Sequence, residues 1–373
     1  TPGSVIYENE LIQLIQYTPV TAEVEKTPLL IVPPCINKFY LLDLGKGNSF
    51  VEYAVAQGHQ VFLISWRSAV PEIGHLTWND YLKLGPLKAI DIVREIAGVE
   101  KVHALGFCVG GTILSCAAGV LAARGEDRLS TITLLTTMVD FSDTGEIGLL
   151  IDQGHVVLRE ATIGNGGILP GKELAFTFGT LRANDLIWRY VVDSYLKGAT
   201  PDAFDLLYWD SDGVSLPGPM YCWYTRNTYL ENKIREPGKT TQCGEDIDLS
   251  RIKAPLYLLA SREDHIVPWR SAYLTKNLMG AEPRFVLAAS GHVAGVINPP
   301  AKNRRSHWLN DDVSGDADVW LGAEETQGSW WPDWDAWLKR HSTGKVAAPV
   351  QPGNENFRVV EPAPGRYVKQ KSD

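Results

Sequence analysis

One cysteine stands where a side chain could serve as a nucleophile. Cys108 lies in the hexapeptide GFCVGG, with Gly106 two residues before it and Gly110 two residues after it. An apolar run at 102–105 precedes this segment and a helical pattern follows it, which predicts a tight strand-to-helix turn that exposes the central side chain. The glycines leave room for neighbouring backbone, and the helix start favours a thiolate. A buried cysteine that only fills space is the alternative, but the combined pattern favours nucleophilic acyl chemistry.

A candidate base and a candidate acid follow this cysteine in the chain, each just beyond a predicted strand. His292 follows the run RFVLAAS, and Asp264 follows the run APLYLLAS. In a catalytic triad, His292 would take the proton of the thiol and Asp264 would fix the tautomer and orientation of the imidazole. Glu263 is the alternative acid, and His265 could assist as a second base. A turn cap at His292 and a helix start at Asp264 are structural alternatives, but they do not explain the positions at successive strand ends.

Acyl transfer through a tetrahedral intermediate also needs two hydrogen-bond donors for the oxyanion. One expected donor is the backbone N–H of Val109, directly after the cysteine. The other is expected from the early loop VPPCINKF (32–39), whose two prolines have no N–H. Cys35 or Ile36 must therefore supply the second donor, and the side chain of Asn37 could help.

The composition is that of an ordinary folded protein of 373 residues. Its 45% hydrophobic and 21% charged residues exclude wholesale disorder. The formal net charge of −9 argues against general nucleic-acid binding. No apolar run approaches the roughly 18 residues of a membrane span, so no span is expected.

Cysteine and histidine usage narrows the chemistry further. The five cysteines include no Cys-x-x-Cys pair, which favours a reducing, cytosolic setting over a disulfide framework. The remaining histidines lack metal-ligand spacing, and no glycine-rich phosphate loop is present, so neither a metal nor a nucleotide cofactor is expected. The chain starts at Thr1 rather than at a methionine, which is typical of a fragment of a longer protein.

Alternating strand and helix patterns must position these side chains. The predicted strands lie at 28–34, 60–66, 102–106, 132–138, 254–261 and 284–290. The predicted helices lie at 49–58, 78–97, 109–124 and 269–278. Gly85-Pro86 should kink or interrupt the second of these helices. Strands separated by helices predict an α/β fold with a mostly parallel sheet flanked by helices.

This alternation stops after Asp140 and returns near 251, which divides the chain. Residues 1–140 and 251–342 are predicted to form the two parts of the core. Residues 141–250, which include a helical pattern at 185–198, are predicted to form an inserted cap, whose length and irregularity favour a mobile lid over a fixed elaboration. The polar, Pro- and Gly-rich residues 343–373 are expected to form a tail on the surface or to be partly disordered.

A thiol at the nucleophile position favours acyl transfer over hydrolysis. A thiol ionises more readily than a hydroxyl and is a better leaving group. Transfer from a thioester donor to cysteine is nearly isoenergetic, so the acyl-enzyme stays activated for attack by an alcohol. The sequence therefore favours a transferase that excludes water. A cysteine hydrolase of the same fold, such as a thioesterase or a dienelactone-hydrolase-like enzyme, is the alternative.

Longer strings along essentially the whole chain carry a family resemblance. They are VPPCINKFYLLDL (32–44), GFCVGGT (106–112), DFSDTGEIG (140–148), NDLIWRYVVDSYLKG (184–198), LPGPMYCWYTRNTYL (216–230), SREDHIVPW (261–269), GHVAGVINPPAKNRRSHW (291–308), GSWWPDWDAWL (328–338) and EPAPGRYVK (361–369). In these strings the chain resembles the catalytic domain of class I polyhydroxyalkanoate synthases. The resemblance implies the α/β-hydrolase fold with an inserted cap.

The same resemblance implies a reaction and its site. Cys108 would carry the growing chain, with Asp264 as the acid and His292 as the base. The substrate would be an (R)-3-hydroxyacyl-CoA, mainly 3-hydroxybutyryl-CoA, and the products would be polyhydroxyalkanoate and free CoA, with no cofactor beyond the CoA thioester. The resemblance further implies a homodimer on cytoplasmic granules, a cap that covers the site and contributes dimer contacts, and a separate N-terminal domain that is absent here.

Two further segments have both a functional and a structural interpretation. Lys302, Arg304 and Arg305 in KNRRSHW are candidates for the CoA phosphates, because an acidic protein needs a local basic patch to bind an anion. A solvated basic turn is the alternative. The tryptophan-rich segment 329–337 could contact the polymer, or its rings could pack behind a helix that starts near Pro332. A catalytically silent granule protein would need no complete triad, so an enzyme is favoured.

Overall fold

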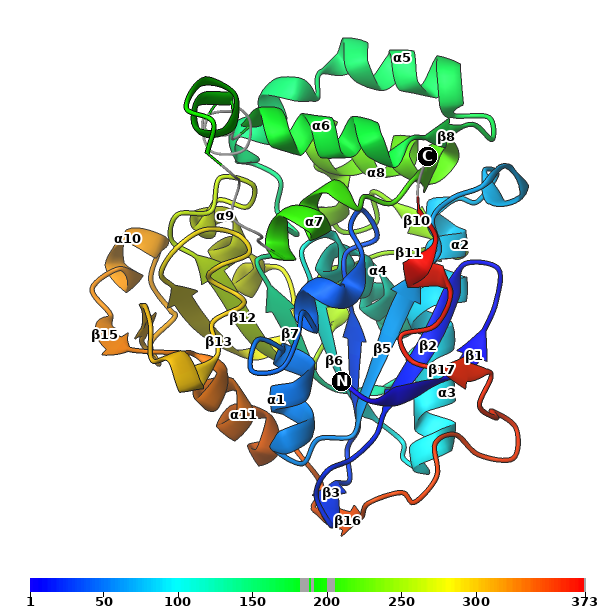
Figure 1. Ribbon diagram of the computed structural model, residues 1–373, viewed down its shortest axis with the longest axis vertical. Helices are drawn as coiled ribbons and strands as arrows, with labels where there is room; N and C mark the ends of the chain where they lie inside the picture. Colours follow the sequence, from blue (N-terminus) through cyan, green and yellow to red (C-terminus); the bar gives the residue numbers. More distant parts are fainter. Residues whose placement is uncertain (182–187, 189–190, 200–204, 372–373) are drawn as a thin grey trace.

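The described residues form an 11-stranded β-sheet with helices on both faces and a group of helices beyond the carboxyl ends of its central strands (Figure 1). The computed structural model describes residues 1–181, 188, 191–199 and 205–371. The strand order is β15-β14-β13-β12-β7-β6-β4-β5-β2-β1-β17. The strands are β1 (Gly3–Glu8), β2 (Ile12–Tyr17), β4 (Leu29–Val32), β5 (Val61–Trp66), β6 (Val102–Phe107), β7 (Leu129–Leu135), β12 (Pro255–Ser261), β13 (Ala281–Ala288), β14 (Ser306–Leu309), β15 (Glu324–Gln327) and β17 (Glu361–Pro362).

The six central strands, from β5 through β4, β6, β7 and β12 to β13, are parallel. The strands β2, β1 and β17 extend one side of the sheet with antiparallel pairing, and β14 and β15 do the same on the other side. Parallel neighbours need crossover helices, which then cover both faces. This arrangement confirms the predicted α/β class with a mostly parallel sheet.

Each face of the sheet has its own apolar core. Along β4, Leu30 and Val32 belong to one core, whereas Leu29 and Ile31 belong to the other, as the two-residue period of a strand requires. The first core is covered by α2 (Trp78–Leu82), α3 (Lys88–Ala97), α4 (Val109–Ala123), α9 (Trp269–Leu274) and α10 (Ala317–Trp320). The second is covered by α1 (Phe50–Ala56) and α11 (Trp331–Arg340).

The helix predicted at 78–97 is interrupted, as the Gly85-Pro86 pair indicated. α2 ends at Leu82, and α3 begins only at Lys88. Gly85 between them has a non-helical backbone, with φ −92° and ψ −110°. A Cβ at Gly85 would lie 2.7 Å from the ring of Trp66, so the kink also lets the chain approach that ring closely.

Some strand boundaries differ from the sequence prediction. The strand predicted at 132–138 is β7 and ends at Leu135, because Thr136 turns out of the sheet with a φ of +40°. The strand predicted at 284–290 begins three residues earlier, at Ala281. The hairpin of β1 and β2 was not predicted at all.

The predicted cap region contributes helices that lie beyond the carboxyl ends of the central strands (Figure 1). They are α5 (Gln153–Ile163), α6 (Gly171–Leu181), α7 (Asp205–Ser211) and α8 (Gly218–Thr225). The helix predicted at 185–198 lies partly outside the described residues, and its described part includes a helical turn at Val191–Leu196. Residues of the predicted cap therefore lie over the carboxyl end of β6, where Cys108 follows the strand.

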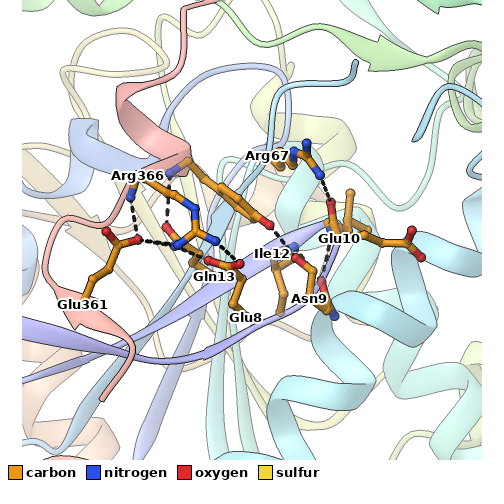
Figure 2. A network of polar contacts seen from close by, with 10 residues as sticks. Glu8, Asn9, Glu10, Ile12, Gln13, Arg67, Glu361 and Arg366 are labelled. Carbon is orange, nitrogen blue, oxygen red and sulfur yellow. Dashed lines mark hydrogen bonds and ion pairs between the residues drawn. The ribbon is translucent and has the colours of Figure 1, made fainter. Parts of the chain in front are cut away.

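The C-terminal segment runs back along the surface and joins the sheet. Its strand β16 (Lys345–Ala347) pairs with β3 (Glu23–Glu25), and β17 pairs with β1. Figure 2 shows the polar contacts that follow β17, in which Arg366 binds both Glu8 and Glu361. Gln13 in β2 donates to Glu361 at 2.6 Å and accepts from the backbone N–H of Tyr367 at 3.2 Å. The described part of this segment is thus fixed to the first two strands.

The tryptophans of 329–337 pack inside the protein. Trp330, Trp331, Trp334 and Trp337 are all buried. Phe50 of α1 contacts the first three of them, with ring centroids 4.8 to 5.9 Å apart. Of the two interpretations of this segment, the structure supports packing behind a helix.

Candidate active site

Cys108 occupies a sharp turn between β6 and α4. Its backbone has φ 52° and ψ −130°, a conformation that non-glycine residues rarely adopt. The turn is held on both sides, because the N–H of Cys108 donates to the carbonyl of Leu135 at 2.9 Å and its own carbonyl accepts from the hydroxyl of Thr137 at 3.1 Å. The side chain is only partly buried and lines a cavity.

The glycines around Cys108 are required by close backbone approach. A Cβ at Gly106 would lie 2.4 Å from the Cα of Gly111. A Cβ at Gly110 would lie 2.3 Å from the carbonyl oxygen of Val32 in the neighbouring strand. Backbone cannot move away as a flexible side chain can, so these positions exclude larger residues. The spacing seen in the sequence therefore has a direct steric cause.

His292 and Asp264 form a hydrogen-bonded pair beside this turn. Nδ1 of His292 lies 2.7 Å from Oδ2 of Asp264. The other carboxylate oxygen of Asp264 accepts the backbone N–H groups of Ile266 and Val267, each at 2.9 Å. These bonds fix the carboxylate, whose side chain has no exposed surface. The ring of His292 stacks on Phe107 with centroids 5.6 Å apart, which fixes the imidazole as well.

The charges at this site favour a protonated imidazole. Burial by itself lowers the pKa of His292. Charge interactions and hydrogen bonds with Asp264 and Cys108 raise it, and they outweigh the effect of burial. The net result is a pKa of His292 well above its usual value. Both Cys108 and Asp264 therefore raise the pKa of His292, and Asp264 does so from its contact with Nδ1. This order of thiol, imidazole and carboxylate is the one that nucleophilic acyl transfer requires.

The two alternative groups next to Asp264 are placed differently. Glu263 is exposed, and its backbone N–H donates to the carbonyl of Ser290 at 3.0 Å. Asp264, and not Glu263, contacts His292. His265 is partly buried and is not among the residues that line the cavity at Cys108.

The cavity at Cys108 has a volume of about 340 Å³ and is walled by both the core and the cap region. The core contributes Cys35, Ile36, Val109 and Ile266. The cap contributes mainly apolar and aromatic side chains, among them Ile147, Leu150, Leu169, Phe176, Leu216, Met220, Tyr221, Tyr224 and Tyr229. Such a lining can bury an acyl chain and exclude water from the thioester.

The predicted oxyanion donors line this cavity. Val109 is the first residue of α4, so its N–H has no partner within the helix. Ile36 and Cys35 face the cavity from the loop after β4. The Cys35 side chain is fully buried, which raises the pKa of its thiol well above the usual value and leaves it without the ionised form a nucleophile needs. Asn37 is not among the lining residues and instead bridges to Gly213.

The predicted CoA-binding cations are exposed and are not among the lining residues. Nζ of Lys302 donates to the side chain of Asn48 at 3.1 Å, and the carbonyl of Arg304 accepts from Asn298 at 3.0 Å. Arg305 has a φ of +62° in the loop before β14. A contact between these cations and CoA phosphates stays a prediction.

The aromatic wall of the cavity was not assigned a role from the sequence. Tyr224 stacks on Trp78 with centroids 5.6 Å apart and meets Tyr229 edge to face at 5.8 Å. Met220 and Tyr224 are four residues apart in α8, so they lie on the same face of that helix. This spacing in LPGPMYCWYTRNTYL was a usable signal for a common surface.

The chain matches known protein families and relatives over most of its length. An alpha/beta hydrolase fold model matches residues 28–299, and the model of the poly-beta-hydroxybutyrate polymerase (PhaC) N-terminus matches residues 1–54. The chain is 55% identical to the poly(3-hydroxyalkanoate) polymerase subunit PhaC of Cupriavidus necator and 42% identical to that of Rhizobium meliloti, in both cases over 100% of this chain. It spans 64% and 61% of the lengths of those two relatives. These matches confirm the resemblance seen in the sequence.

Solved structures support the fold alone. A soluble variant of monoglyceride lipase from Saccharomyces cerevisiae matches with a TM-score of 0.55 at 12% identity, covering 92% of this chain and 97% of the lipase. A monoacylglycerol lipase from Paleococcus ferrophilus matches with a TM-score of 0.50 at 15% identity, covering 90% of this chain and 100% of that one. Within the described residues, no helix is both long and apolar enough to cross a membrane.

Proposed function

The chain belongs to the alpha/beta hydrolase family and matches poly(3-hydroxyalkanoate) polymerases along its whole length, and on this premise we propose that it is an acyltransferase. It polymerises (R)-3-hydroxyacyl-CoA, mainly 3-hydroxybutyryl-CoA, into polyhydroxyalkanoate and releases CoA. The observation that carries this proposal is a thiol at the nucleophile turn, beside a hydrogen-bonded His292–Asp264 pair and under an apolar cap.

Acylation of Cys108 is the first step. His292 takes the proton from Sγ, and the sulfur attacks the carbonyl carbon of the CoA thioester. The N–H groups of Val109 and of Ile36 or Cys35 stabilise the oxyanion that forms. The carbon–sulfur bond to CoA then breaks, and the leaving CoA sulfur receives the proton from His292. Asp264 keeps the imidazole in the required orientation throughout.

Chain growth repeats the same chemistry with an alcohol. His292 takes the proton of a 3-hydroxyl group, and that oxygen attacks the carbonyl carbon of a second acyl thioester. An ester bond forms, the carbon–sulfur bond breaks, and the sulfur leaves as the thiol after it takes the proton. The thioester of Cys108 stays activated for this attack, and the apolar lining of the cavity keeps water from competing.

The proposal extends to location and assembly. We expect a cytoplasmic enzyme that acts as a homodimer on polyhydroxyalkanoate granules. Exposed apolar side chains on the cap support a surface that is covered by another copy or by polymer. They include Leu149, Val157, Leu158, Phe176, Tyr195 and Leu196.

CoA release from (R)-3-hydroxybutyryl-CoA, with recovery and sizing of the acyl product, tests this function. Wild-type enzyme should release CoA and form polymer, and Cys108→Ala should lose both activities while its fold is retained. Cys108→Ser serves as the conservative variant and should be strongly impaired, because a hydroxyl ionises less readily and forms an oxygen ester of lower energy. Free 3-hydroxybutyrate in place of polymer would favour the cysteine hydrolase instead.

A further inference from the structure

The loop that offers the second oxyanion donor is held by the cap rather than by the core alone. The backbone N–H of Val214 donates to the carbonyl of Ile36 at 3.1 Å. The indole N–H of Trp209 donates to the carbonyl of Lys38 at 2.7 Å. Asn37 between them forms an isolated β-bridge with Gly213. The cap segment 209–214 thus contacts three consecutive residues of this loop.

Lys38 extends this contact through a buried ammonium group. Its side chain is only 3% exposed, and Nζ donates to Oδ1 of Asp212 at 2.7 Å. Nζ also donates to the backbone carbonyl of Gln370 at 2.7 Å. The hydroxyl of Tyr40 donates to the other carboxylate oxygen of Asp212 at 3.0 Å. One side chain therefore joins the loop after β4, the cap and the C-terminal segment.

A buried ion pair of this kind needs a reason other than stability. Taking an ammonium and a carboxylate out of water costs free energy that their attraction often fails to recover, and apolar residues of similar volume are often as stable. Lys38 is not among the residues that line the cavity, and its ammonium group is already bonded to Asp212 and Gln370. The role that fits its contacts is to fix the position of the loop.

We propose that Lys38 is a positioning residue for the oxyanion hole. Lys38 places the backbone amide of Ile36 correctly only when both of its partners, Asp212 of the cap and Gln370 of the C-terminal segment, are in place. The proposal rests on the function proposed above and adds a link between the seating of the cap and the chemical step. If the cap segment 209–214 moves, the contacts to Ile36 and Lys38 are lost together, and the donor is displaced.

The size of the effect follows from the geometry of acyl transfer. Loss of one oxyanion donor lowers the rate by roughly 100- to 1,000-fold. Displacement of a positioned group by about 1 Å can lower it by about 100-fold. Because Lys38 acts through the neighbouring backbone, the expected loss is about 10- to 100-fold in kcat, with little change in KM.

The test compares Lys38→Met with Lys46→Met, a substitution of an exposed lysine in a nearby loop. CoA release from (R)-3-hydroxybutyryl-CoA and alkylation of Cys108 by iodoacetamide are measured in parallel, because alkylation needs the thiolate but forms no oxyanion. Lys38→Met should lose about 10- to 100-fold in kcat for CoA release and keep its alkylation rate within about twofold, whereas Lys46→Met should change neither. Lys38→Arg should recover part of the loss, since it keeps the positive charge and offers several N–H donors.

Two results would overturn the proposal. Unchanged CoA release in Lys38→Met would show that the loop needs no such support, and an equal loss of alkylation would place the effect on the thiol instead. If Lys38→Met does not fold, Asp212→Asn gives the same readouts without the carboxylate charge. A wild-type enzyme that releases CoA but yields free acid would contradict polymerisation and leave this comparison valid, because hydrolysis uses the same oxyanion hole.

Discussion

At the scale of single residues, backbone hydrogen bonds hold the side chains of the candidate site in place. Cys108 is held in an unusual conformation by hydrogen bonds to Leu135 and Thr137, and Asp264 is held by two amide N–H groups. His292 lies between these two fixed groups. Its raised pKa is therefore a property of the folded site, which leads to a testable dependence on pH.

Replacement of His292 by Gln should lower the free energy of unfolding most at low pH. A group whose pKa is raised by folding stabilises the protein when it is protonated. This contribution is fully present below the unfolded-chain pKa of about 6.5 and is lost as the pH rises through the higher folded value. Denaturant unfolding over a series of pH values from about 6 upward should show a loss that becomes smaller as the pH rises. The exposed His75, changed to Gln, is the control, and a loss that stays constant across the series would contradict the expectation.

The positions of Cys108, Asp264 and His292 at neighbouring strand ends could be predicted from the sequence, because each residue follows a recognisable local pattern; their catalytic roles stay a prediction. Cys108 has its glycines, while Asp264 and His292 each follow an apolar strand. The spacing of Met220 and Tyr224 indicates that they share a helix face. The pattern of this irregular region does not say whether that face turns toward the sheet, so the cavity wall itself could not be predicted. The sequence shows that Lys302, Arg304 and Arg305 are positively charged, but it could not show whether they lie near the cavity at Cys108.

At the scale of elements, α11 is joined to the sheet by aromatic packing. Its residue Trp334 is fully buried, contacts Phe50 at 4.8 Å between ring centroids and donates from Nε1 to the hydroxyl of Thr133 at 3.1 Å. Thr133 belongs to β7, whose end leads to the residues that hold Cys108. This helix thus supports the sheet from the face opposite α4.

Trp334→Ala should destabilise the protein by about 3–5 kcal/mol, because it removes a large buried ring and leaves a cavity. Trp188→Ala, at a position that is 57% exposed, should change stability by no more than about 0.5 kcal/mol. Denaturant unfolding of both variants measures the difference. Equal stability of the two variants would show that the aromatic cluster does not support the fold.

The edge elements show why the fold could be predicted only in part. All six residues of β2 are buried, although Gln13 and Gln16 interrupt its apolar pattern. These amides are satisfied by the C-terminal segment, since Gln13 bonds to Glu361 at 2.6 Å and Gln16 accepts from the N–H of Gly353 at 2.6 Å. Partners more than 300 residues away leave no local pattern, whereas the central strands are visible as short apolar runs.

At the scale of the whole molecule, the C-terminal segment completes the sheet and supports the active-site loop. β17 covers the outer strand β1, and Gln370 accepts from Lys38. An uncovered edge strand presents unpaired backbone groups that can bind another chain. Stability, solubility and the geometry of the oxyanion hole therefore depend on the same segment.

A chain that ends after Arg358 should unfold at a temperature several degrees lower and should aggregate as its concentration rises. It should also lose CoA release to about the same degree as Lys38→Met, since Gln370 is removed. A chain that ends after Lys371 keeps both β17 and Gln370 and serves as the control. Scanning calorimetry and light scattering measure the first two effects. An unchanged unfolding temperature in the shorter chain would show that the segment only lies on the surface.

The long span between Lys38 and Gln370 also has a consequence in time. The two residues are 332 positions apart in the chain, and ribosomes add about 5–20 residues per second. On the order of half a minute therefore separates the synthesis of the loop from that of its last hydrogen-bond partner. Cys108 is made early in that interval and His292 only near its end, and until Gln370 follows, the loop after β4 still lacks one of its supports. On the proposed mechanism, a nascent chain would thus remain a poor catalyst until the contact between Lys38 and Gln370 forms.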